Sequence, residues 1–466
     1  MEQDDFRVEV DSMGEVNVPR DAYWGAQTQR ALENFPISGL VFPRDLNYAL
    51  GMIKKSAAEV NLQLGLLPEN IAKGIAAAAE ELAEGTLDSH MKVDIFQTGS
   101  GTSTNMNANE VIANRANELL GFAVGNKHPV HPNDHVNKGQ SSNDVIPSAI
   151  HVAVLVALRR DLVPALDDLA SILEQKAQAF YHIVKSGRTH LQDATPIRLG
   201  QEIGGYAHMA RRSVKRIRNT FANLKELPLG GTAVGTGVNT HPRFAAQTIA
   251  RVNQLTGLDF LEAENHFEAQ GAQDALVEVS GALKTIAVSL MKIADDIRWL
   301  GSGPRNGLGE LELPAVQPGS SIMPGKVNPV IPEALIQVCA QVIGNDSTVT
   351  LGGQWGQFEL NTMMPVMAYN LMQSIQILAN GVRLFATKCC AGLEANEERC
   401  RQSLERNLAM ATALAPHIGY DRAAGIARQA YETGVTVREA AAKRLDMDHR
   451  QLEQILDPEN SLLRKS

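Results

Sequence analysis

Residues 275–300 read ALVEVSGALKTIAVSLMKIADDIRWL, and this stretch decides the fold class. Its apolar side chains recur at alternating steps of three and four residues, at Leu276, Val279, Leu283, Ile286, Leu290, Ile293, Ile297 and Leu300. This spacing is typical of a helix that packs along its whole length against nearly parallel neighbours. The Gly301-Ser302-Gly303-Pro304 that follows predicts the end of the helix, with glycine in a left-handed cap and proline just beyond.

A second long helix is predicted from about Asp144 to Lys185, because apolar residues again follow the helical period. Pro147 is expected in its first turn, Pro164 is expected to kink it, and Gly187 marks its predicted end. The residues expected to face inward are Val154, Leu155, Leu158, Leu162, Leu166, Leu169 and Leu173. Further helical patterns cover residues 201–224, 332–342 and 365–385.

Long helices separated by turns rich in glycine, proline and asparagine predict a mainly α protein built around a long central helical bundle. We expect three regions: an N-terminal mixed, mostly helical domain at 1–139, a central long-helix bundle domain at 140–397, and a small C-terminal helical domain at 398–466. Small residues beside the apolar seam, such as Ala287 and Ala294, would let another helix approach closely. They favour oligomerisation, although packing within one chain would explain the same pattern.

The composition of the 466 residues fits this fold class. The chain is 44% hydrophobic and 20% charged, so it can bury a large core, and only 5% of residues are aromatic. Few aromatic residues favour packed helices over a β-sandwich. The formal net charge of −9 argues against nucleic acid or an anionic membrane as the main partner. It leaves an anionic substrate open, because the local charge at a site decides that.

Cysteine usage and the N-terminal residues indicate the compartment. Cys339, Cys389, Cys390 and Cys400 do not form a disulfide framework, which predicts a reducing environment. Residues 1–5 are acidic and unlike a secretory signal or a transit peptide. The longest apolar run, Val152–Leu158, is far shorter than the roughly 18 residues that suggest a membrane span. We therefore expect a soluble, cytoplasmic protein without a membrane partner.

Two polar segments precede predicted helices. Residues 99–107, GSGTSTNMN, come just before the helical pattern of 110–120. Glycines let the backbone approach a ligand, and a helix N-terminus offers free N–H groups to an anion. An ordinary helix cap would explain only one or two of these residues. Residues 140–144, QSSND, open the second long helix, and on their own they are equally well explained as a capping sequence.

Two further polar segments carry charged or titratable groups. In the stretch 187–193, GRTHLQD, His190 could face a cleft, although a lone histidine is more often structural. Residues 318–329, PGSSIMPGKVNP, are the most specific of the four segments. Their glycines and prolines flank two serines, which predicts a loop that can close over a site. Lys326 supplies a positive charge and Asn328 a neutral donor, and Glu333 lies in the first turn of the next helix.

Motifs for nucleotides and metals are missing. The sequence has no Walker A motif, no Gly-x-Gly-x-x-Gly between a strand and a helix, and no Gly-x-Ser-x-Gly. His128, His131 and His135 are close in sequence, but Pro129 and Pro132 prevent the continuous helix that would align them. We predict neither a metal ion nor an organic cofactor.

Together these segments resemble the aspartase/fumarase superfamily, and most closely class II fumarate hydratase. The stretch GSSIMPGKVNP at 319–329 is the superfamily signature, and the resemblance covers nearly the whole chain. It extends through GSGT at 99–102, HPND at 131–134, SSND at 141–144, GGTAVGTG at 230–237 and HIGY at 417–420. Fumarases carry GRTH, SSND and PGK, as here, where aspartate ammonia-lyases tend to GRTQ, STND and PAK. His135 and PVIPE at 329–333 look aspartase-like, and His128 stands where some relatives have arginine.

The resemblance implies reversible anti addition of water to fumarate, giving (S)-malate, in the tricarboxylic acid cycle. It implies Ser320 as the base, His190 as the group acting on water at the opposite face, and Glu333 as the residue that orients His190. The implied substrate-binding residues are Ser100, Gly101, Thr102, Ser141, Ser142, Asn143, Thr189, Ser321, Lys326, Val327 and Asn328. An accessory dicarboxylate site is implied at His131, Pro132, Asn133 and Asp134.

The family is a homotetramer in which segments from three subunits meet at each active site, so the resemblance implies a bundle that assembles into a tetramer core. The nearest alternative activity is that of an aspartate ammonia-lyase, which releases ammonia and fumarate from aspartate. A non-catalytic helical scaffold is the alternative from another class. The presence of His190, Ser320, Lys326 and Asn328 argues against the scaffold.

Overall fold

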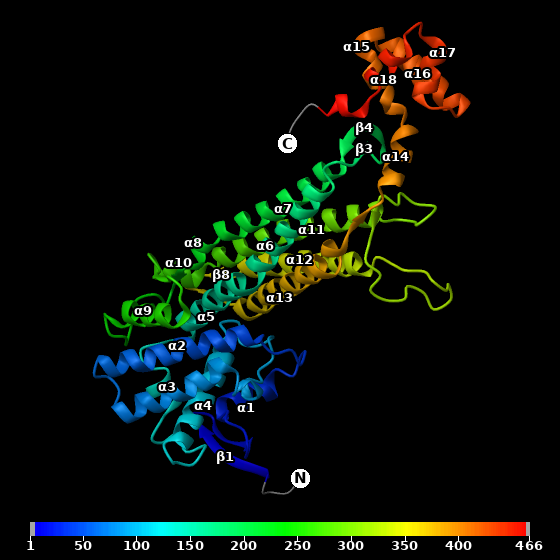
Figure 1. Cartoon of the computed structure of the whole chain (residues 1–466). Coiled ribbons are helices and arrows are strands. Elements are labelled where there is room, and N and C mark those ends of the chain that lie inside the picture. The colour runs from blue at the N-terminus through cyan, green and yellow to red at the C-terminus, as the bar shows by residue number, and fades with distance from the viewer. Residues whose placement is uncertain (1–4, 463–466) are drawn as a thin grey trace. The chain divides into compact units, whose positions relative to one another are not determined.

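The structure is a computed structural model, and it describes residues 5–462 (Figure 1). The chain forms two compact units, each made from three stretches of sequence. The first unit comprises Met1–Val163, Lys215–Ala287 and Ala340–Leu378. The second comprises Pro164–Val214, Val288–Cys339 and Ala379–Ser466.

Helices dominate both units, which confirms the predicted mainly α class. Beyond the two long helices treated below, the α-helices are α1 (Ala26–Asn34), α2 (Arg44–Gln63), α3 (Glu69–Glu84), α4 (Thr102–Leu119), α7 (Leu199–Asn219), α8 (Phe221–Leu224), α9 (Phe244–Thr256), α10 (His266–Gly271), α12 (Val330–Gly353), α13 (Met364–Lys388), α14 (Glu397–Glu405), α15 (Ala415–Ile418), α16 (Tyr420–Thr433), α17 (Val437–Arg444) and α18 (His449–Ile455). The helical patterns predicted at 201–224, 332–342 and 365–385 are confirmed within α7, α8, α12 and α13.

The strands form small two-stranded sheets. The longest are β1 (Phe6–Asp11) with β2 (Gly14–Pro19), and β3 (Val184–Thr189) with β4 (Gln192–Arg198), both antiparallel. Two-residue strands pair as β7 (Leu311–Glu312) with β10 (Glu394–Ala395) and β8 (Gly356–Gln357) with β9 (Leu360–Asn361), both antiparallel, and as β5 (Glu226–Leu227) with β6 (Leu261–Glu262), in parallel.

The helix that decided the fold class is α11 (Asp274–Leu300). Every residue of its predicted apolar seam is buried, and the most exposed of them, Leu300, is only 4% exposed. The predicted helix end is confirmed, because α11 stops at Leu300 and Gly303, directly before Pro304, has a positive φ of +140°. Gly301 has a different role: a Cβ there would lie 2.2 Å from Cδ1 of Leu313, so glycine permits a close approach.

The second long helix is α5 (Ser142–Ala157), a π-helical turn η4 (Leu158–Leu162) and α6 (Val163–Ala179). All of its predicted inward-facing residues are buried. The π-helical turn ends two residues before Pro164, whose missing N–H interrupts the regular hydrogen bonds where the kink was predicted. The predicted ends are wrong. The helix starts at Ser142, which places Pro147 beyond the first turn, and it stops at Ala179, while Gly187 lies in β3.

Long helices pack side by side in each unit. In the first unit, Ser280 on α11 donates to Asp346 on α12 at 2.8 Å, and Asn345 on α12 donates to Ser374 on α13 at 3.0 Å. In the second unit, Tyr206 on α7 donates to Asp296 on α11 at 2.8 Å. These polar contacts fix the rotation of helices whose apolar seams alone would allow several alignments.

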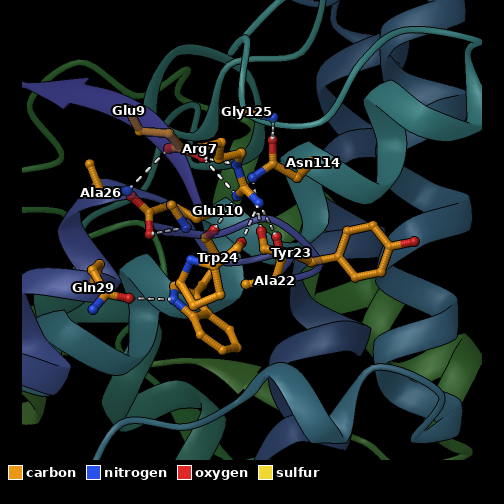
Figure 2. Close-up of polar contacts among 12 residues, drawn as sticks. Arg7, Glu9, Ala22, Tyr23, Trp24, Ala26, Gln29, Glu110, Asn114 and Gly125 are labelled. Carbon is orange, nitrogen blue, oxygen red and sulfur yellow. Dashed lines mark hydrogen bonds and ion pairs between the residues drawn. The ribbon is translucent and has the colours of Figure 1, made fainter. Parts of the chain in front are cut away.

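Buried carboxylate and guanidinium groups hold the N-terminal segment of the first unit (Figure 2). Arg7 donates to the carbonyl oxygens of Ala22 and Trp24, each at 2.7 Å. Glu110 on α4 accepts hydrogen bonds from the backbone N–H groups of Gly25 and Thr28, at 2.9 and 3.0 Å. Its carboxylate thereby satisfies N–H groups that the first turn of α1 leaves without an intrahelical partner. Burial raises the pKa of Glu110, while the hydrogen bonds from Thr28 and its neighbours oppose that shift.

The four cysteines are all free and buried. Burial raises the pKa of Cys339 to about 12, and burial followed by the charge of Glu310 raises the pKa of Cys400 to about 12. Across residues 5–462, no helix has the length and apolarity that crossing a membrane would require.

Candidate functional site

The first candidate segment shapes the N-terminus of α4. Gly101 is the N-cap, with φ of +73°, and Thr102 is the first helical residue. The hydroxyls of Ser100 and Thr102 lie 2.8 Å apart and share a hydrogen bond. A Cβ on Gly99 would lie 1.9 Å from the carbonyl oxygen of Thr362, so that position requires glycine. The helix thus begins within the polar segment, earlier than the helical pattern of 110–120 suggested, and its free N–H groups lie beside Ser100.

The second candidate segment caps α5. Ser141 accepts a hydrogen bond from the N–H of Asn143 at 3.2 Å, and Asp144 accepts one from the N–H of Ser141 at 2.9 Å. This reciprocal pair is a capping box, so the structural reading of the segment holds. The side chain of Asn143 donates to the carbonyl oxygen of Ala233 at 2.7 Å, which connects the cap to the 230–237 segment.

The structure brings these two segments together. Asn105 on α4 donates to the hydroxyl of Ser142 at 2.9 Å. A Cβ on Gly101 would lie 2.9 Å from the side chain of Ile146, so the start of α4 packs tightly against α5. Two adjacent helix N-termini place partial positive charge and free N–H donors in one region of the first unit. That arrangement suits an anion with carboxylate groups.

A buried lysine lies close to the second segment. Lys54 on α2 is fully buried and donates to Asn137 at 2.9 Å and to Gln140 at 3.0 Å. Burial lowers the pKa of Lys54 to about 7, and the charge of Asp144 opposes part of that shift. No sequence motif points to Lys54, because α2 carries none and a lysine in a helix normally faces solvent.

Asp144 itself is fully buried and connects two parts of the first unit. One carboxylate oxygen accepts from the N–H of Ser141, and the other accepts from the N–H groups of Gly230 and Thr232, at 2.9 and 3.0 Å. Burial raises the pKa of Asp144, although these backbone hydrogen bonds oppose the change. The segment GGTAVGTG is therefore anchored to the N-terminus of α5 by the carboxylate of Asp144 as well as by the side chain of Asn143.

His190 lies at the tip of the hairpin β3–β4 in the second unit. Thr189 pairs with Gln192, which leaves a turn of two residues, His190 and Leu191. Both have left-handed backbones, with φ of +56° and +58°. Such turns normally contain asparagine and glycine, so the backbone is strained at this position. The turn presents Thr189 and His190 at an exposed tip.

Ser320 lies in the 318–329 loop of the second unit and accepts two backbone hydrogen bonds. The N–H groups of Ile322 and Met323 donate to its hydroxyl oxygen at 3.2 and 2.9 Å. Two N–H groups aimed at one oxygen would stabilise negative charge there. Asn328 donates to the carbonyl oxygen of Gly319 at 2.6 Å, which closes the base of the loop.

Several candidate side chains remain available for a ligand. In the part of the chain that the structure describes, the side chains of His190, Lys326 and Glu333 make no hydrogen bond or ion pair. Ser321 and Val327 are exposed on the same loop as Lys326, and Glu333 lies in the first turn of α12. Glu333 therefore does not hydrogen-bond to His190 within a single described chain, so the predicted orientation of His190 by Glu333 is not formed there.

The candidate accessory site is a π-helical turn, η3 (Pro132–Val136), capped by His131. The Nδ1 atom of His131 accepts from the N–H groups of Asn133 and Asp134, both at 3.2 Å. The carboxylate of Asp134 lies 3.4 Å from the same nitrogen. Nδ1 of His135 accepts from the N–H of His131 at 2.9 Å. Among residues 5–462, no group of three or more histidine, cysteine or acidic side chains is arranged to hold a metal ion.

Comparison with known proteins decides the family. A family model described as "Lyase" matches residues 14–344, and one described as "Fumarase C C-terminus" matches residues 410–460. The chain is 56% identical to the class II fumarate hydratase of Halobacterium salinarum, over 98% of this chain and 97% of that protein. It is 52% identical to that of Nitrosomonas europaea, over 98% and 99%. This chain belongs to the class II fumarate hydratase family.

Solved structures of this lyase family share the fold. The class II fumarase of Schistosoma mansoni superposes with a TM-score of 0.95 at 39% identity, covering 98% of this chain and 99% of that one. A Brucella melitensis structure described as "fumarate lyase:delta crystallin", bound to cobalt, gives a TM-score of 0.94 at 47% identity, over 98% and 100%. The predicted aspartase/fumarase-like fold is thereby confirmed, and membership of the fumarate hydratase family makes the chain a hydro-lyase.

Proposed function

We propose that this chain catalyses the reversible anti addition of water to fumarate, giving (S)-malate, as a step of the tricarboxylic acid cycle. The observation that carries the proposal is the sequence identity between this chain and curated class II fumarate hydratases, which extends along nearly their whole length. The site residues support it, because they offer neutral hydrogen-bond donors and one lysine, and need neither a metal ion nor an organic cofactor.

The chemistry explains why such residues suit the reaction. In the malate-to-fumarate direction, a base removes a proton from the carbon next to one carboxylate, and that carboxylate becomes a doubly charged aci-carboxylate. The proton is weakly acidic, so the site must stabilise the new charge more strongly than the substrate itself. The hydroxyl on the neighbouring carbon then leaves, with a proton, as water. The proposed donors for these steps are Thr102, Ser141, Asn143, Thr189, Lys326 and Asn328.

Ser320 is the proposed base. A serine alkoxide is unfavourable in water, so the site has to stabilise its negative charge. The two N–H groups that donate to its hydroxyl oxygen, from Ile322 and Met323, supply part of that stabilisation. On the opposite face, His190 would act on the departing or attacking water, oriented by Glu333. Opposite faces for base and water account for anti addition.

Substrate binding would use the paired starts of α4 and α5. Ser100, Gly101 and Thr102 come from one helix start, and Ser141, Ser142 and Asn143 from the other. Their N–H and hydroxyl groups would hold a carboxylate of the dicarboxylic acid. Ser321, Lys326, Val327 and Asn328 would complete the pocket from the loop that bears Ser320.

The proposed assembly is a cytoplasmic homotetramer in which three subunits contribute to each active site. It would allow Glu333 and His190 to meet across subunits, since their side chains form no hydrogen bond or ion pair within one described chain. A second dicarboxylate would bind at the accessory site of His131, Pro132, Asn133 and Asp134. Light scattering on the purified protein should give four times the mass of the 50.4 kDa chain. A monomer that is fully active would overturn the shared active site.

One assay separates the proposed activity from the alternative, aspartate ammonia-lyase. Purified protein is given malate in one cuvette and aspartate in another, and fumarate absorbance is followed in both. Absorbance should rise with malate only. A rise with aspartate alone would replace the hydratase by the ammonia-lyase, and no rise with either would favour a non-catalytic scaffold.

A further inference from the structure

The hairpin that presents His190 rests on four charged side chains, which we call the hairpin ion cluster: Lys185, Arg188, Glu202 and Glu310. Lys185 on β3 contacts Glu202 at 2.6 Å and Glu310 at 2.8 Å. Arg188, on the same strand, donates from both terminal nitrogens to Glu310, at 3.0 and 2.7 Å. The side chains of Lys185 and Glu310 are 0% exposed, and that of Arg188 is 18% exposed. The cluster lies entirely within the second unit.

The charges of the cluster balance, with two cations facing two carboxylates. Burial alone would raise the pKa of Glu310, but hydrogen bonds from Arg188 and the charge of Lys185 outweigh it and lower that pKa. The carboxylate therefore stays ionised between its two cations. Removal of one partner from a buried ion pair leaves a charge without compensation, which is strongly unfavourable.

The strained backbone of the turn has to be held by fixed neighbouring contacts, and the ion pairs of the cluster supply them. A left-handed backbone is unfavourable for residues other than glycine, and both His190 and Leu191 adopt it. The strand register also shifts between Ser186 and Gly187. A bidentate pair of hydrogen bonds to a carboxylate fixes the plane of a guanidinium as well as its distance. Arg188 is two residues before His190, so Glu310 restrains the strand that leads directly into the turn.

Glu310 also lies just before the segment that bears Ser320. Its own N–H donates to the carbonyl oxygen of Leu300 at 2.9 Å, and its carbonyl oxygen accepts from the N–H of Asn396 at 3.0 Å. β7 begins at the next residue and leads into the 318–329 loop. One residue with a fixed backbone and a buried side chain thus stands at the base of both candidate catalytic segments of the second unit.

We infer that Glu310 is a positioning residue: through Arg188, its carboxylate holds the hairpin tip in the geometry that His190 needs for catalysis. Glu310 does not touch substrate in this proposal. The inference rests on the proposed hydratase activity, because His190 has a role only there. The competing view is that Glu310 contributes to stability alone, and the experiment must separate the two.

The first test compares Glu310→Gln with wild-type protein. The amide keeps the shape of the side chain but loses its charge, so Arg188 is no longer held by a carboxylate. We expect kcat for fumarate hydration to fall about 100-fold, the loss typical of a displacement of about 1 Å at a reacting group. KM should change by less than about threefold, because Thr189 is the one proposed substrate-binding residue that lies in this hairpin, and the others lie on other segments. Glu174→Gln is the matched control, since Glu174 pairs with Arg211 at 2.9 Å on exposed helix surfaces of the same unit.

A double variant separates positioning from stability. Glu310→Gln leaves two cations and one carboxylate in the cluster, and adding Lys185→Met restores one of each. The melting temperature should therefore recover in the double variant, while kcat stays low because Arg188 still lacks its carboxylate partner. Recovery of kcat together with the melting temperature would overturn the inference. A value of kcat within twofold of wild type in Glu310→Gln would also overturn it.

Hydrogen exchange provides a readout that does not depend on activity. Backbone amides of residues 187–194 should exchange faster in Glu310→Gln and in the double variant than in wild-type protein or Glu174→Gln. If wild-type protein lacks hydratase activity, the proposed function fails, and unchanged exchange in the hairpin would separately refute the anchoring.

Should Glu310→Gln not fold, Arg188→Lys replaces it, because lysine keeps the charge but cannot form the bidentate pair of hydrogen bonds to the carboxylate. A kcat lowered about tenfold at an unchanged melting temperature would support positioning, and an unchanged kcat would refute it.

Discussion

Asn105 donates a hydrogen bond of 2.9 Å to the hydroxyl of Ser142, and the two side chains are buried where the starts of α4 and α5 meet. This bond aligns the two helix N-termini that we propose for substrate carboxylates. A variant that lacks this bond therefore tests substrate binding separately from the chemical step.

Asn105→Leu keeps the volume of the side chain and removes the donor. We expect KM for fumarate to rise about fivefold with little change in kcat, because a hydrogen bond is worth about 1 kcal/mol and misaligned donors weaken ground-state and transition-state binding alike. Steady-state kinetics measures both constants. Asn109→Leu is the control, since Asn109 is buried one turn further along α4 and its side chain donates to the sulfur of Met106, away from Ser142. An equal rise of KM in both variants would refute this role of Asn105.

Ser320→Ala should abolish most of the activity. Loss of the proposed base is expected to lower kcat by about 10²–10⁴-fold, the usual contribution of a positioned acid or base. The fold should persist, because the loop retains the hydrogen bond from Asn328 to Gly319. Initial rates together with circular dichroism check both statements, and Ser347→Ala on the exposed side of α12 serves as the control. A rate within tenfold of wild type would remove Ser320 from the role of base.

His190→Asn tests the group on the opposite face. Asparagine tolerates the left-handed backbone of the turn, so the hairpin should keep its conformation. We expect kcat to fall about 100-fold or more, while the free energy of unfolding changes by less than about 0.5 kcal/mol, because the side chain is exposed. The measurements are kcat and denaturant unfolding, with His182→Asn as a control for loss of an exposed histidine. Near-normal turnover by a folded His190→Asn protein would contradict the mechanism.

Lys54 should make stability depend on pH. Burial lowers its pKa to about 7 in the folded protein, against about 10.4 in an unfolded chain, so between these values the unfolded state binds more protons. The contribution of Lys54 to stability is then present above the unfolded pKa and lost as the pH falls through about 7. The free energy of unfolding of wild-type protein, relative to Lys54→Met, should rise with pH by up to about 1.4 kcal/mol per unit between pH 7 and 9. A difference that does not vary over this range would show that Lys54 stays charged when folded.

Apolar periodicity predicted the long helices well, because their burial follows directly from the spacing of residues such as Leu283 and Ile293. Helix ends were predicted less well. The sequence pattern predicts a helix stop at Gly187, yet Gly187 lies in a strand, where a Cβ would come within 2.6 Å of the carbonyl oxygen of Thr195. A glycine signals a special backbone or a close approach, and sequence alone does not say which.

The candidate site could be predicted as motifs but not as contacts. Runs of small polar residues revealed the segments around Thr102, Asn143 and Ser320. The charged groups that hold these segments carry no such signal: Lys54 lies in an ordinary helix, and Glu310 stands 122 residues after its partner Arg188. Long-range ion pairs depend on the tertiary fold, so no local pattern encodes them. The division into three regions and the individual catalytic roles stay predictions.

The burial of all four cysteines has a practical consequence for following the hairpin. Thiol reagents attack the thiolate, and burial suppresses it at Cys339 and Cys400, whose pKa values are raised to about 12. A cysteine introduced at Leu191, which is 71% exposed, would therefore be alkylated ahead of the natural thiols. A fluorophore or spin label could then be attached beside His190 without first removing any native cysteine.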